Sequence, residues 1–456
     1  MYDVAIIGGG PGGYAAALYA HNFGLKVALI EKERVGGTCL IRGCIPAKTW
    51  LQAAHVFSVV KKSSEFGVNS SEPTVDWSVA LERKNNVVNG LVNGLSGLLK
   101  ARNVDVINGF GTIKNGGVEV TTDDSSTQQI EAANVILATG SVPRSIPGYE
   151  IDGERIVTSD HALDWDEQPQ RVAVIGGGVI GCEFASLLSD FGTEVHIFEA
   201  LDQLLPGMDP DAVKPLERAL RKKKVKINTG TMVGPPEMSD GGVTINYGDK
   251  SVEVDVVLMA VGRGPATDNV GLDGTAAVVD RGFVEVDLNT MQTAQEKLFA
   301  VGDIVAATPQ LAHAGFAEGI AAITYIATGQ AAPVDYRAIP LVVYTDPEVA
   351  QVGMTEAQAK ENGLDVEATS HGMRGVGRAI IQGEIGGTVK VVHEKDGPIV
   401  GASVAGPAAG EMIHELMYTV AWEALPAEAA AYIHAHPTIS EAIGETLLSA
   451  SGRSLH

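Results

Sequence analysis

The feature that most constrains the fold of this chain is an internal repeat of one strand–turn–helix–strand unit. Val4–Glu31 reads VAIIGGGPGGYAAALYAHNFGLKVALIE, and Val172–Glu199 reads VAVIGGGVIGCEFASLLSDFGTEVHIFE, so the two segments align without a gap. In each copy a β-branched strand runs into a glycine turn, an apolar helix and a second strand that ends on glutamate. Because parallel strands joined through a helix build α/β sheets, the repeat predicts two Rossmann-like dinucleotide-binding domains.

The glycines of both copies follow the spacing G-x-G-x-x-G, which is strong evidence only when a strand, a helix and a terminal acid accompany it, as they do here. The first glycine forms the tight turn, the second admits a pyrophosphate at the helix N-terminus, and the third lets the helix pack on the strand. These tasks fall to Gly8, Gly10 and Gly13 in the first copy and to Gly176, Gly178 and Gly181 in the second.

The glutamates that end the two copies predict what each site binds. A carboxylate at this position accepts hydrogen bonds from a ribose diol, so Glu31 and Glu199 should each bind a ribose. Glu199 would repel a 2′-phosphate, which favours NAD(H) over NADP(H) at the second site. Two dinucleotide sites in one chain suggest FAD at the first and NAD at the second, with electrons passing between them.

The helix of the second copy carries Glu183 where the first copy has Ala15. Two interpretations are equally open. The carboxylate either favours the positive end of the helix dipole, or it is directed at the contact between flavin and nicotinamide.

The repeat also predicts the domain organisation. Residues 1–144 form the first part of an FAD-binding domain, and residues 145–262 form the NAD-binding domain. Residues 263–334 return to the FAD-binding domain through the strand-and-glycine segment LFAVGDI and a helix. Residues 335–456 contain strands such as GTVKVVHE but no nucleotide motif, which predicts an α+β cap or oligomer interface.

Composition excludes several other classes of protein. The net charge of -23 argues against nucleic acid or an anionic membrane as partner. No segment approaches the roughly 18 apolar residues of a membrane span, and the N-terminus lacks the basic region of a secretory signal. We therefore expect a cytoplasmic protein.

Two of the three cysteines, Cys39 and Cys44, lie in the segment GGTCLIRGCIPAK. A metal site needs about four ligands, and the chain has no second cysteine pair and no nearby histidine. A structural disulfide is disfavoured in a reducing compartment, so a redox pair remains. We expect no metal, and we expect Cys182, at the start of the second helix, to be a small core residue.

The spacing of the pair has a geometric consequence. Bridged cysteines need Cα atoms within about 7 Å, whereas five residues of ideal helix rise about 7.5 Å. Cys39 and Cys44 can therefore bridge only in distorted backbone, which Gly43 permits, and a bridge in such backbone is labile. Lys48, just behind the pair, is either a surface lysine of the helix or a cation close enough to the flavin to stabilise its reduced, anionic form.

These motifs together resemble those of the flavin-dependent pyridine nucleotide–disulfide oxidoreductases. GGTCLIRGCIPAK is similar to the active-site segment of that family, and LFAVGD, YTDPEVAQVGMTEAQA and HAHPTISEA follow in the family's order. The resemblance extends from residue 2 to the last residues. It implies FAD, NAD and a homodimer, with a C-terminal α+β dimerisation domain and an active site completed across the subunit interface.

The resemblance also implies residue roles. Cys39 would be the thiol that exchanges with the substrate, Cys44 would be the thiolate that faces the flavin, and Lys48 would pair with Glu183 near the flavin N5. Besides the first glycine turn, the FAD site would include Thr38, Lys48, Gly111, Thr139, Gly140, Asp303, Leu311 and Ala312. Besides the second glycine turn, the NAD site would include Val233, Gly262 and Arg263.

The segment HAHPTISEA contains the candidate acid–base group. Thiol–disulfide exchange needs a thiolate, so a histidine oriented by a carboxylate suits this chemistry. The residues alone leave His434 and His436 nearly even. The resemblance selects His436 as the acid–base residue, with Glu441 as its orienting carboxylate, both supplied from the other subunit.

Within the family, the chain is most similar to enzymes that oxidise protein-bound dihydrolipoamide to lipoamide with NAD⁺. The lipoyl group would be carried by a separate protein of a 2-oxo acid dehydrogenase or glycine-cleavage complex. The alternatives are another NAD(P)H-dependent disulfide reductase of the same family and a non-catalytic flavin-binding subunit. The sequence departs from the family pattern at Ile41-Arg42 and at Ala47, positions that line the helix and are expected to tune the site rather than perform chemistry. The atypical segment MRGVGRAII leaves contacts of the interface domain with substrate or partner open.

Overall fold

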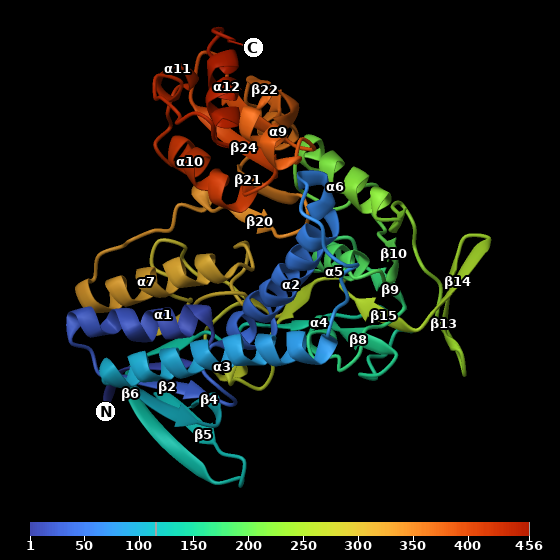
Figure 1. The fold of residues 1–456 in the computed structure, drawn as a ribbon. Coiled ribbons are helices and arrows are strands. Elements are labelled where there is room, and N and C mark those ends of the chain that lie inside the picture. The colour runs from blue at the N-terminus through green and yellow to red at the C-terminus, as the bar shows by residue number, and fades with distance from the viewer. Residues whose placement is uncertain (115, 456) are drawn as a thin grey trace. The chain divides into compact units, whose positions relative to one another are not determined.

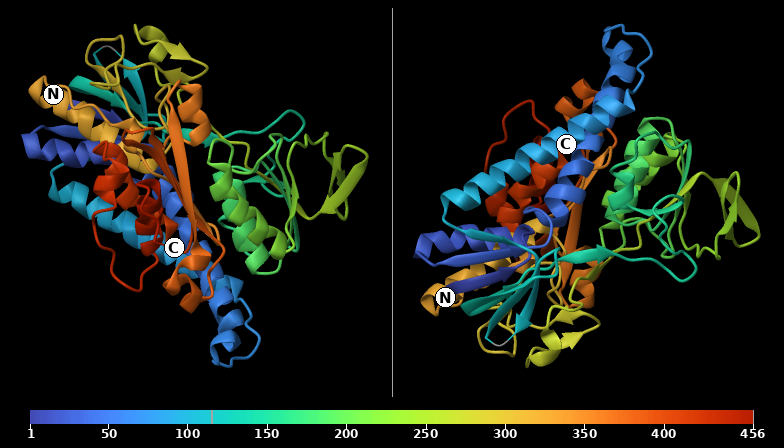
Figure 2. Two further views of the ribbon diagram at one scale, coloured as in Figure 1. Left: turned by 90° about the horizontal axis from the view of Figure 1, so that it is seen from above. Right: turned by 90° about the horizontal axis from the view of Figure 1, so that it is seen from below.

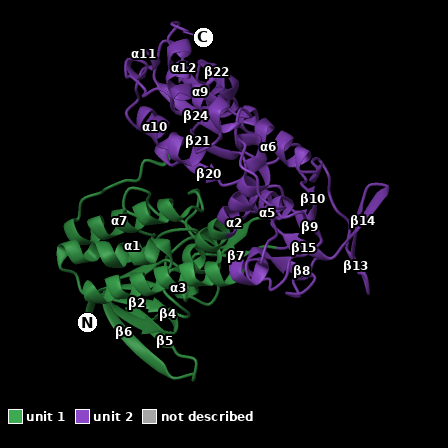
Figure 3. Cartoon of the chain, in the orientation of Figure 1, with its two compact units in different colours: residues 1–49, 81–144, 262–336 green, residues 50–80, 145–261, 337–456 purple. Residues whose placement is uncertain are grey.

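The computed structural model describes residues 1–114 and 116–455, and it divides into two compact units (Figure 3). Unit 1 consists of residues 1–49, 81–144 and 262–336. Unit 2 consists of residues 50–80, 145–261 and 337–456. The structure thus groups residues 50–80 with unit 2, whereas the sequence prediction kept residues 1–144 together.

Unit 1 is built on a parallel sheet with strand order β3-β2-β1-β6 and with β19 paired to the far side of β6. Two further strands, β4 and β5, continue from the first half of β6 as an antiparallel extension. Val4–Ile7 is a continuous buried apolar run, as expected for a parallel strand covered on both faces. The strands are β1 (Tyr2–Ile7), β2 (Val27–Glu31), β3 (Asp105–Asn108), β4 (Phe110–Lys114), β5 (Gly117–Thr121), β6 (Thr127–Leu137) and β19 (Leu298–Ala300).

Two helices of unit 1, α1 (Pro11–Ala20) and α7 (Ala312–Thr328), lie side by side on one face of this sheet (Figures 1 and 2). Their backbones approach closely, because a Cβ added at Gly319 would lie 2.5 Å from the carbonyl oxygen of Gly12. Helix α3 (Trp77–Ala101) contributes Leu99 to the core of the unit. Two short antiparallel pairs complete it: β7 (Ser141–Pro143) with β16 (Arg263–Pro265), and β17 (Val279–Asp280) with β18 (Phe283–Val284).

Unit 2 repeats the arrangement with a parallel sheet of order β11-β10-β9-β15-β8. Helix α5 (Val179–Asp190) packs on it, with its opening turn after β9. A small antiparallel sheet of β12, β13 and β14 is attached. The strands are β8 (Ile156–Thr158), β9 (Arg171–Ile175), β10 (Glu194–Phe198), β11 (Lys226–Asn228), β12 (Glu237–Ser239), β13 (Gly242–Tyr247), β14 (Lys250–Val254) and β15 (Val256–Met259), with helix α4 (Ser159–Ala162) after β8.

The C-terminal part of unit 2 is an antiparallel sheet of order β20-β21-β24-β23-β22 with helices packed against it. Its core contains Val389, Val404, Ile413 and Leu447, all almost fully buried. The strands are β20 (Leu341–Val343), β21 (Glu348–Gly353), β22 (Val366–Gly372), β23 (Thr388–Glu394) and β24 (Ile399–Gly406). The helices are α6 (Pro210–Lys222), α8 (Glu356–Glu361), α9 (Gly377–Gln382), α10 (Ala409–Ala421), α11 (Pro426–Ala429) and α12 (Glu441–Ala450).

Helix α2 (Cys44–Lys62) starts in unit 1 and ends in unit 2, and aromatic contacts explain why its second half groups with unit 2. The Trp50 and Trp77 rings lie 4.4 Å apart, and both meet Phe191 edge-on. Both indole N–H groups donate to backbone carbonyls of unit 2, at 3.1 Å to Leu163 and 2.8 Å to Trp165. Buried tryptophans with satisfied N–H groups are strong anchors.

The observed architecture confirms the predicted fold class of two Rossmann-like domains and an α+β C-terminal domain. Within the described residues, no helix combines the length and apolar character needed to cross a bilayer.

Candidate active site

The first glycine turn lies where the strand order of the unit 1 sheet changes direction, between β1 and β6. Open α/β sheets bind their ligands at this point, outside the carboxyl ends of the strands. A Cβ added at Gly8 would lie 2.2 Å from the Ala138 carbonyl oxygen, and one added at Gly13 would lie 1.9 Å from the Gly8 oxygen. Gly8 has a φ of +105°, so the turn needs glycine for its conformation as well as for space.

The second glycine turn has nearly the same geometry between β9 and β15. A Cβ added at Gly176 would lie 2.3 Å from the Ala260 oxygen, and one added at Gly181 would lie 2.0 Å from the Gly176 oxygen. A Cβ added at Gly178 would meet nothing within 4 Å. That open space, at the N-terminus of α5, is where the sequence places a pyrophosphate.

Both terminal glutamates form hydrogen bonds with the backbone of their glycine turns. Glu31 accepts the N–H of Gly9 at 2.7 Å, and Glu199 accepts the N–H of Gly177 at the same distance. The other oxygen of each carboxylate accepts an N–H two residues ahead, from Glu33 and from Leu201. Burial raises the pKa of Glu31, against the lowering effect of the hydrogen bond from Gly9.

The residues predicted to hold FAD fit a ligand at the first switch point. The Thr139 hydroxyl is buried and has no hydrogen-bond partner in the described part of the chain, so a ligand atom would satisfy it. A Cβ added at Gly140 or Gly302 would meet nothing within 4 Å. Gly111 packs against Ile7 and Ile30, and the predicted backbone residues Leu311 and Ala312 form the N-terminus of α7.

The Asp303 side chain belongs to a hydrogen-bond network that reaches the cysteine segment. Asp303 accepts the Ser141 hydroxyl, and Ser141 in turn accepts the Arg263 Nε at 2.8 Å. The Arg263 Nη2 donates to the Ser141 carbonyl at 2.7 Å and to the Thr38 hydroxyl at 3.4 Å. Gly262 and Arg263, predicted for the NAD site, thus belong to unit 1, whereas Val233 packs near the β13–β15 core of unit 2.

The cysteine segment has the irregular backbone that the spacing predicts. Thr38–Arg42 forms one π-helical turn, Gly43 leaves the helical region, and Cys44 opens α2. Gly37 lies against the glycine turn, because an added Cβ would be 2.4 Å from the Gly10 Cα. The segment is therefore packed directly on the first dinucleotide-binding turn, and Leu40 secures it in a small apolar cluster with Val88 and Val92 of α3.

The Cys39 and Cys44 side chains are thiols in mutual contact. A hydrogen bond to Cys44, followed by burial, raises the pKa of Cys39, and the nearby Lys48 opposes that shift. Tyr14 of α1 lies in the same place. Burial and the charges of the two cysteines raise the pKa of its phenol to about 12. In this arrangement Cys39 therefore favours its protonated, thiol form.

The two candidate histidines have different surroundings. His436 Nδ1 lies 2.8 Å from a Glu441 oxygen, and its side chain is 78% exposed within this chain. The N–H of Thr438, followed by His436, holds the pKa of Glu441 below its usual range. His434 is only 14% exposed and pairs with Glu415 at 2.7 Å, which raises its pKa. Of the two, His436 is the one that a second molecule can reach.

Glu183 and Cys182 lie in the opening turns of α5 in unit 2. Glu183 is buried, and one of its oxygens accepts the Tyr344 N–H at 3.0 Å. The Cys182 thiol is fully buried and donates to the Gly177 carbonyl at 3.2 Å, as expected for a structural residue.

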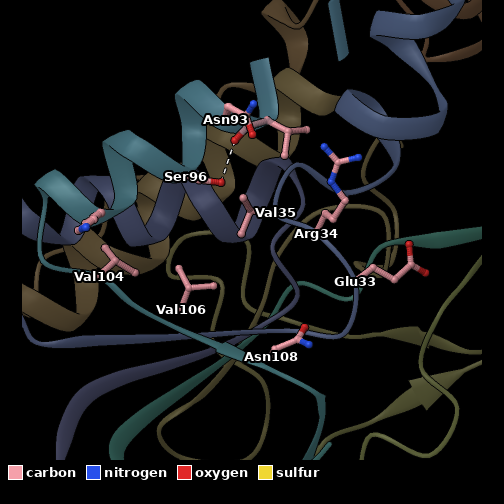
Figure 4. Close-up of a pocket in the computed structure, with 10 residues that line it drawn as sticks. Glu33, Arg34, Val35, Asn93, Ser96, Val104, Val106 and Asn108 are labelled. Carbon is pink, nitrogen blue, oxygen red and sulfur yellow. Dashed lines mark hydrogen bonds between the residues drawn. The ribbon is translucent and has the colours of Figure 1, made fainter. Parts of the chain in front are cut away.

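A cavity of about 560 Å³ lies between α3 and the edge strand β3 (Figure 4). It is lined by Glu33, Arg34, Val35, Val92, Asn93, Ser96, Lys100, Val104, Val106 and Asn108. None of these is a predicted site residue, although the lining begins two residues after Glu31.

Three residues of the site were absent from the sequence prediction. Ser141 joins Asp303 to Arg263, Tyr14 lies beside the thiols, and Glu318 contacts the turn before Asp303. Only Glu318 carries a signal in the sequence, since it is the one acid in the apolar helix AHAGFAEGIAAITYIAT. The other two have ordinary residue types, and only the tertiary structure brings them to the site.

Curated proteins similar over the whole chain are named dihydrolipoyl dehydrogenase. Two from Bacillus subtilis are 37% and 40% identical and cover 100% of this chain, with 99% and 97% of their own lengths aligned. One from Geobacillus stearothermophilus is 38% identical over 100% of this chain and 97% of its own length.

Two solved structures illustrate how widely this fold is shared with known proteins. LpdA from Mycobacterium tuberculosis has a TM-score of 0.91 at 27% identity, covering 98% of this chain and 99% of its own. The HOCl-induced flavoprotein disulfide reductase RclA from Escherichia coli has a TM-score of 0.86 at 28% identity, with 98% and 99% covered.

Family matches cover most of the chain. Residues 2–319 match the pyridine nucleotide-disulphide oxidoreductase family, and residues 339–447 match the dimerisation domain of that family. The structure has the parts that such a protein needs. They are two glycine turns at two switch points, a thiol pair packed on the first turn, and a C-terminal α+β domain. The chain belongs to the pyridine nucleotide-disulphide oxidoreductase family.

Proposed function

We propose that this enzyme oxidises protein-bound dihydrolipoamide to lipoamide with NAD⁺ as the electron acceptor. The observation that carries the proposal is the Cys39–Cys44 thiol pair in an irregular turn packed on the first dinucleotide-binding turn. The names of the whole-length relatives support the choice of substrate. Glu199 at the second turn supports NAD⁺ over NADP⁺.

The two glycine turns divide the cofactors between them. The first turn, with Glu31, Thr139, Gly140 and Asp303, binds FAD, and the second turn, with Glu199, binds NAD⁺. Bound FAD supplies the two-electron step between the thiol pair and the nicotinamide. The chain itself positions the groups and controls their protons.

The dithiol substrate reduces a Cys39–Cys44 disulfide in two exchanges. One substrate thiolate attacks the Cys39 sulfur, and the bond between the cysteines breaks with its electron pair on Cys44. The second substrate thiolate attacks the substrate sulfur of the mixed disulfide, which closes lipoamide and releases Cys39. Two electrons now reside on the two cysteines, and Lys48 opposes the accumulating negative charge.

We assign the base for these exchanges to His436 of the partner subunit. The substrate thiol that attacks Cys39 must first lose its proton, and His436, which is exposed and oriented by Glu441, can accept it. The raised pKa of Cys39 favours return of a proton to this sulfur when it is released. A dimerisation domain over residues 339–447 supports delivery of this histidine to a neighbouring subunit. Glu441, held anionic by its lowered pKa, stabilises the imidazolium that forms.

Two further assignments complete the proposal. We assign both Lys48, near the start of α2, and Glu183, near the start of α5, to the surroundings of the flavin. The lipoyl group arrives on a separate protein of a 2-oxo acid dehydrogenase or glycine-cleavage complex. The redox use of a cysteine pair in a chain with three cysteines fits a cytoplasmic enzyme.

The test uses purified enzyme with four substrate combinations. Dihydrolipoamide with NAD⁺ should turn over at least about a hundredfold faster than with NADP⁺, because Glu199 repels the 2′-phosphate. Oxidised glutathione with NADH or NADPH should give no comparable rate. Turnover of glutathione with NADPH, and none of dihydrolipoamide with NAD⁺, would assign the enzyme to another reductase of the family.

A further inference from the structure

Glu318 is a buried carboxylate that the proposed reaction does not use. Its side chain is 0% exposed, on the face of α7 turned into unit 1. One oxygen accepts the Gly302 N–H at 2.6 Å, and the other accepts the Tyr336 hydroxyl at 3.1 Å. In the described part of the chain no lysine, arginine or histidine pairs with it.

An unpaired carboxylate in such a place favours its neutral form. Burial raises the pKa of Glu318 to about 7, and the charge of Asp303 adds to that shift. The hydrogen bonds from Gly302 and Tyr336 oppose it. Near neutral pH the protonated and ionised forms of Glu318 therefore differ little in free energy.

The position of Glu318 connects it to the predicted FAD site. Gly302, whose N–H it accepts, has a left-handed φ of +78° and directly precedes Asp303. The next residue of α7, Gly319, would place an added Cβ 2.5 Å from the carbonyl oxygen of Gly12 in α1. The carboxylate thus lies next to both the Asp303 turn and the helix that follows the first glycine turn.

We propose that Glu318 is a positioning residue that holds the Gly302–Asp303 turn for FAD and takes up a proton from solvent when FAD binds. The proposal rests on the assignment of FAD to the first glycine turn. The pyrophosphate of FAD brings negative charge to this edge of the sheet, and a like charge nearby disfavours an ionised carboxylate. Protonation of Glu318 removes that repulsion, so FAD is held more tightly when the group is neutral.

The sign of the pH dependence follows from linkage. Well below pH 7 Glu318 is protonated with or without FAD, so the affinity for FAD does not change with pH. Above that range FAD binding requires proton uptake, so the affinity falls as the pH rises, by at most about tenfold per pH unit.

Other groups near Glu318 must be separated from it in the test. Asp303 faces it from the turn after β19, and Tyr336 faces it from the segment after α7. The titratable side chains of α1 are the phenols of Tyr14 and Tyr19, and those of α7 besides Glu318 are His313 and Tyr325. Because substitution of Glu318 leaves all of these in place, the difference between variant and wild type reports on Glu318.

The experiment measures FAD release from the full-length holoenzyme after dilution, by the rise in flavin fluorescence between pH 6 and pH 9.5. In the wild type, release should accelerate above neutral pH by up to about tenfold per unit. Glu318→Gln should release FAD at a rate that varies less than about twofold over the same range. Glu348→Gln is the matched control, because Glu348 is also mostly buried and accepts a glycine N–H, from Gly410 at 2.9 Å in unit 2.

A second variant keeps the proposal testable if Glu318→Gln does not fold. Tyr336→Phe removes a donor that favours the ionised form, so the accelerating part of the profile should move to higher pH. Profiles of Glu318→Gln or Tyr336→Phe that superimpose on the wild type would overturn the proposal. A wild-type protein that binds no FAD would instead contradict the proposed function.

Discussion

At the residue scale, one hydrogen bond with Glu441 orients His436, the residue proposed as the base. Glu441 stays ionised because the Thr438 N–H and His436 lower its pKa. An ionised carboxylate next to Nδ1 accepts a hydrogen bond, which fixes the proton on Nδ1 and leaves Nε2 as the basic nitrogen. The neighbouring His434 forms a hydrogen bond with Glu415 through Nε2 and packs against Gly444. Its Nε2 is therefore not available to accept a proton from a second molecule.

Replacement of this base should separate the two halves of the reaction. His436→Gln should lower dihydrolipoamide turnover by about a hundredfold to ten-thousandfold, the usual contribution of a general base. NADH oxidation by an artificial dye does not need the thiol exchange, so it should stay near the wild-type rate. Steady-state assays of both reactions check this, with His434→Gln as the control that retains most activity in each. Equal losses in the two assays would remove His436 from the mechanism.

The repeat supplies a matched pair for testing nucleotide choice. Glu199→Gln keeps the shape of the side chain but removes the charge that repels a 2′-phosphate. The ratio of kcat/KM for NADH to that for NADPH should therefore fall by about tenfold or more. Glu31→Gln makes the same change at the other turn and should leave this ratio unchanged. A similar fall in both variants would mean that Glu199 does not choose the nucleotide.

Some residues of the site could be read from the sequence because local pattern determines their surroundings. The glycines and the terminal acids of both copies are of this kind, since a strand, a turn and a helix place them regardless of the rest of the chain. Arg263 is not. Its guanidinium meets Thr38 and Ser141, which come from two other segments of unit 1, so only the assembled sheet shows that it lies beside the cysteine segment.

At the element scale, helices α1 and α5 pack closely on their glycine turns through Gly13 and Gly181. Each of these lies three residues after the glycine assigned to the pyrophosphate. The two glycines of α5 differ in a way that an experiment can use. A Cβ at Gly181 would lie 2.0 Å from the Gly176 oxygen, whereas a Cβ at Gly178 would meet no protein atom within 4 Å. A side chain at Gly181 would therefore disturb the packing of the protein, whereas a side chain at Gly178 would affect only a bound ligand.

Alanine at each position should separate stability from NAD binding. Gly181→Ala should lower the free energy of unfolding by about 1–3 kcal/mol, the usual cost of overpacking. Gly178→Ala should leave thermal stability unchanged and raise the KM for NADH, because its methyl group enters the space for the pyrophosphate. Thermal denaturation and NADH titration check both, and FAD should remain bound in each variant. Equal stability of the two variants would contradict the packing argument.

Sequence patterns predicted the strand–turn–helix–strand unit of both nucleotide-binding regions, but they did not predict two other features of the fold. The π-helical turn Thr38–Arg42 follows from no apolar period, although the cysteine spacing required some distortion there. The grouping of residues 50–80 with unit 2 depends on Trp50 and Trp77, whose partners Leu163 and Trp165 are distant in sequence. Long-range side-chain contacts of this kind leave no local pattern.

At the scale of the whole molecule, the C-terminal domain carries large exposed apolar side chains. Tyr418 and Trp422 stack on each other and are 51% and 75% exposed, and Ile433, three residues before His436, is 98% exposed. Such side chains on a soluble surface mark a contact with another protein. Their position in the dimerisation domain makes a second subunit the expected partner.

A mixture of two inactive variants tests whether the base comes from the partner. Cys44→Ser lacks the thiol pair and His436→Gln lacks the base, so neither homodimer should turn over dihydrolipoamide. After dissociation and reassociation, each mixed dimer has one site with both groups intact. Random mixing should restore about a quarter of the wild-type turnover. No recovery in mixed dimers, confirmed by mass, would mean that each subunit uses its own histidine.

The hydrogen bonds of Glu31 and Glu199 also bear on how fast the nucleotides arrive. Each carboxylate already links a glycine turn to the loop after the second strand, by two backbone N–H groups. Both loops are thus preorganised before a nucleotide binds, and the entropy of ordering them is lost during folding rather than during association. Nucleotide capture should accordingly proceed in a single concentration-dependent phase, with no slower loop closure behind it.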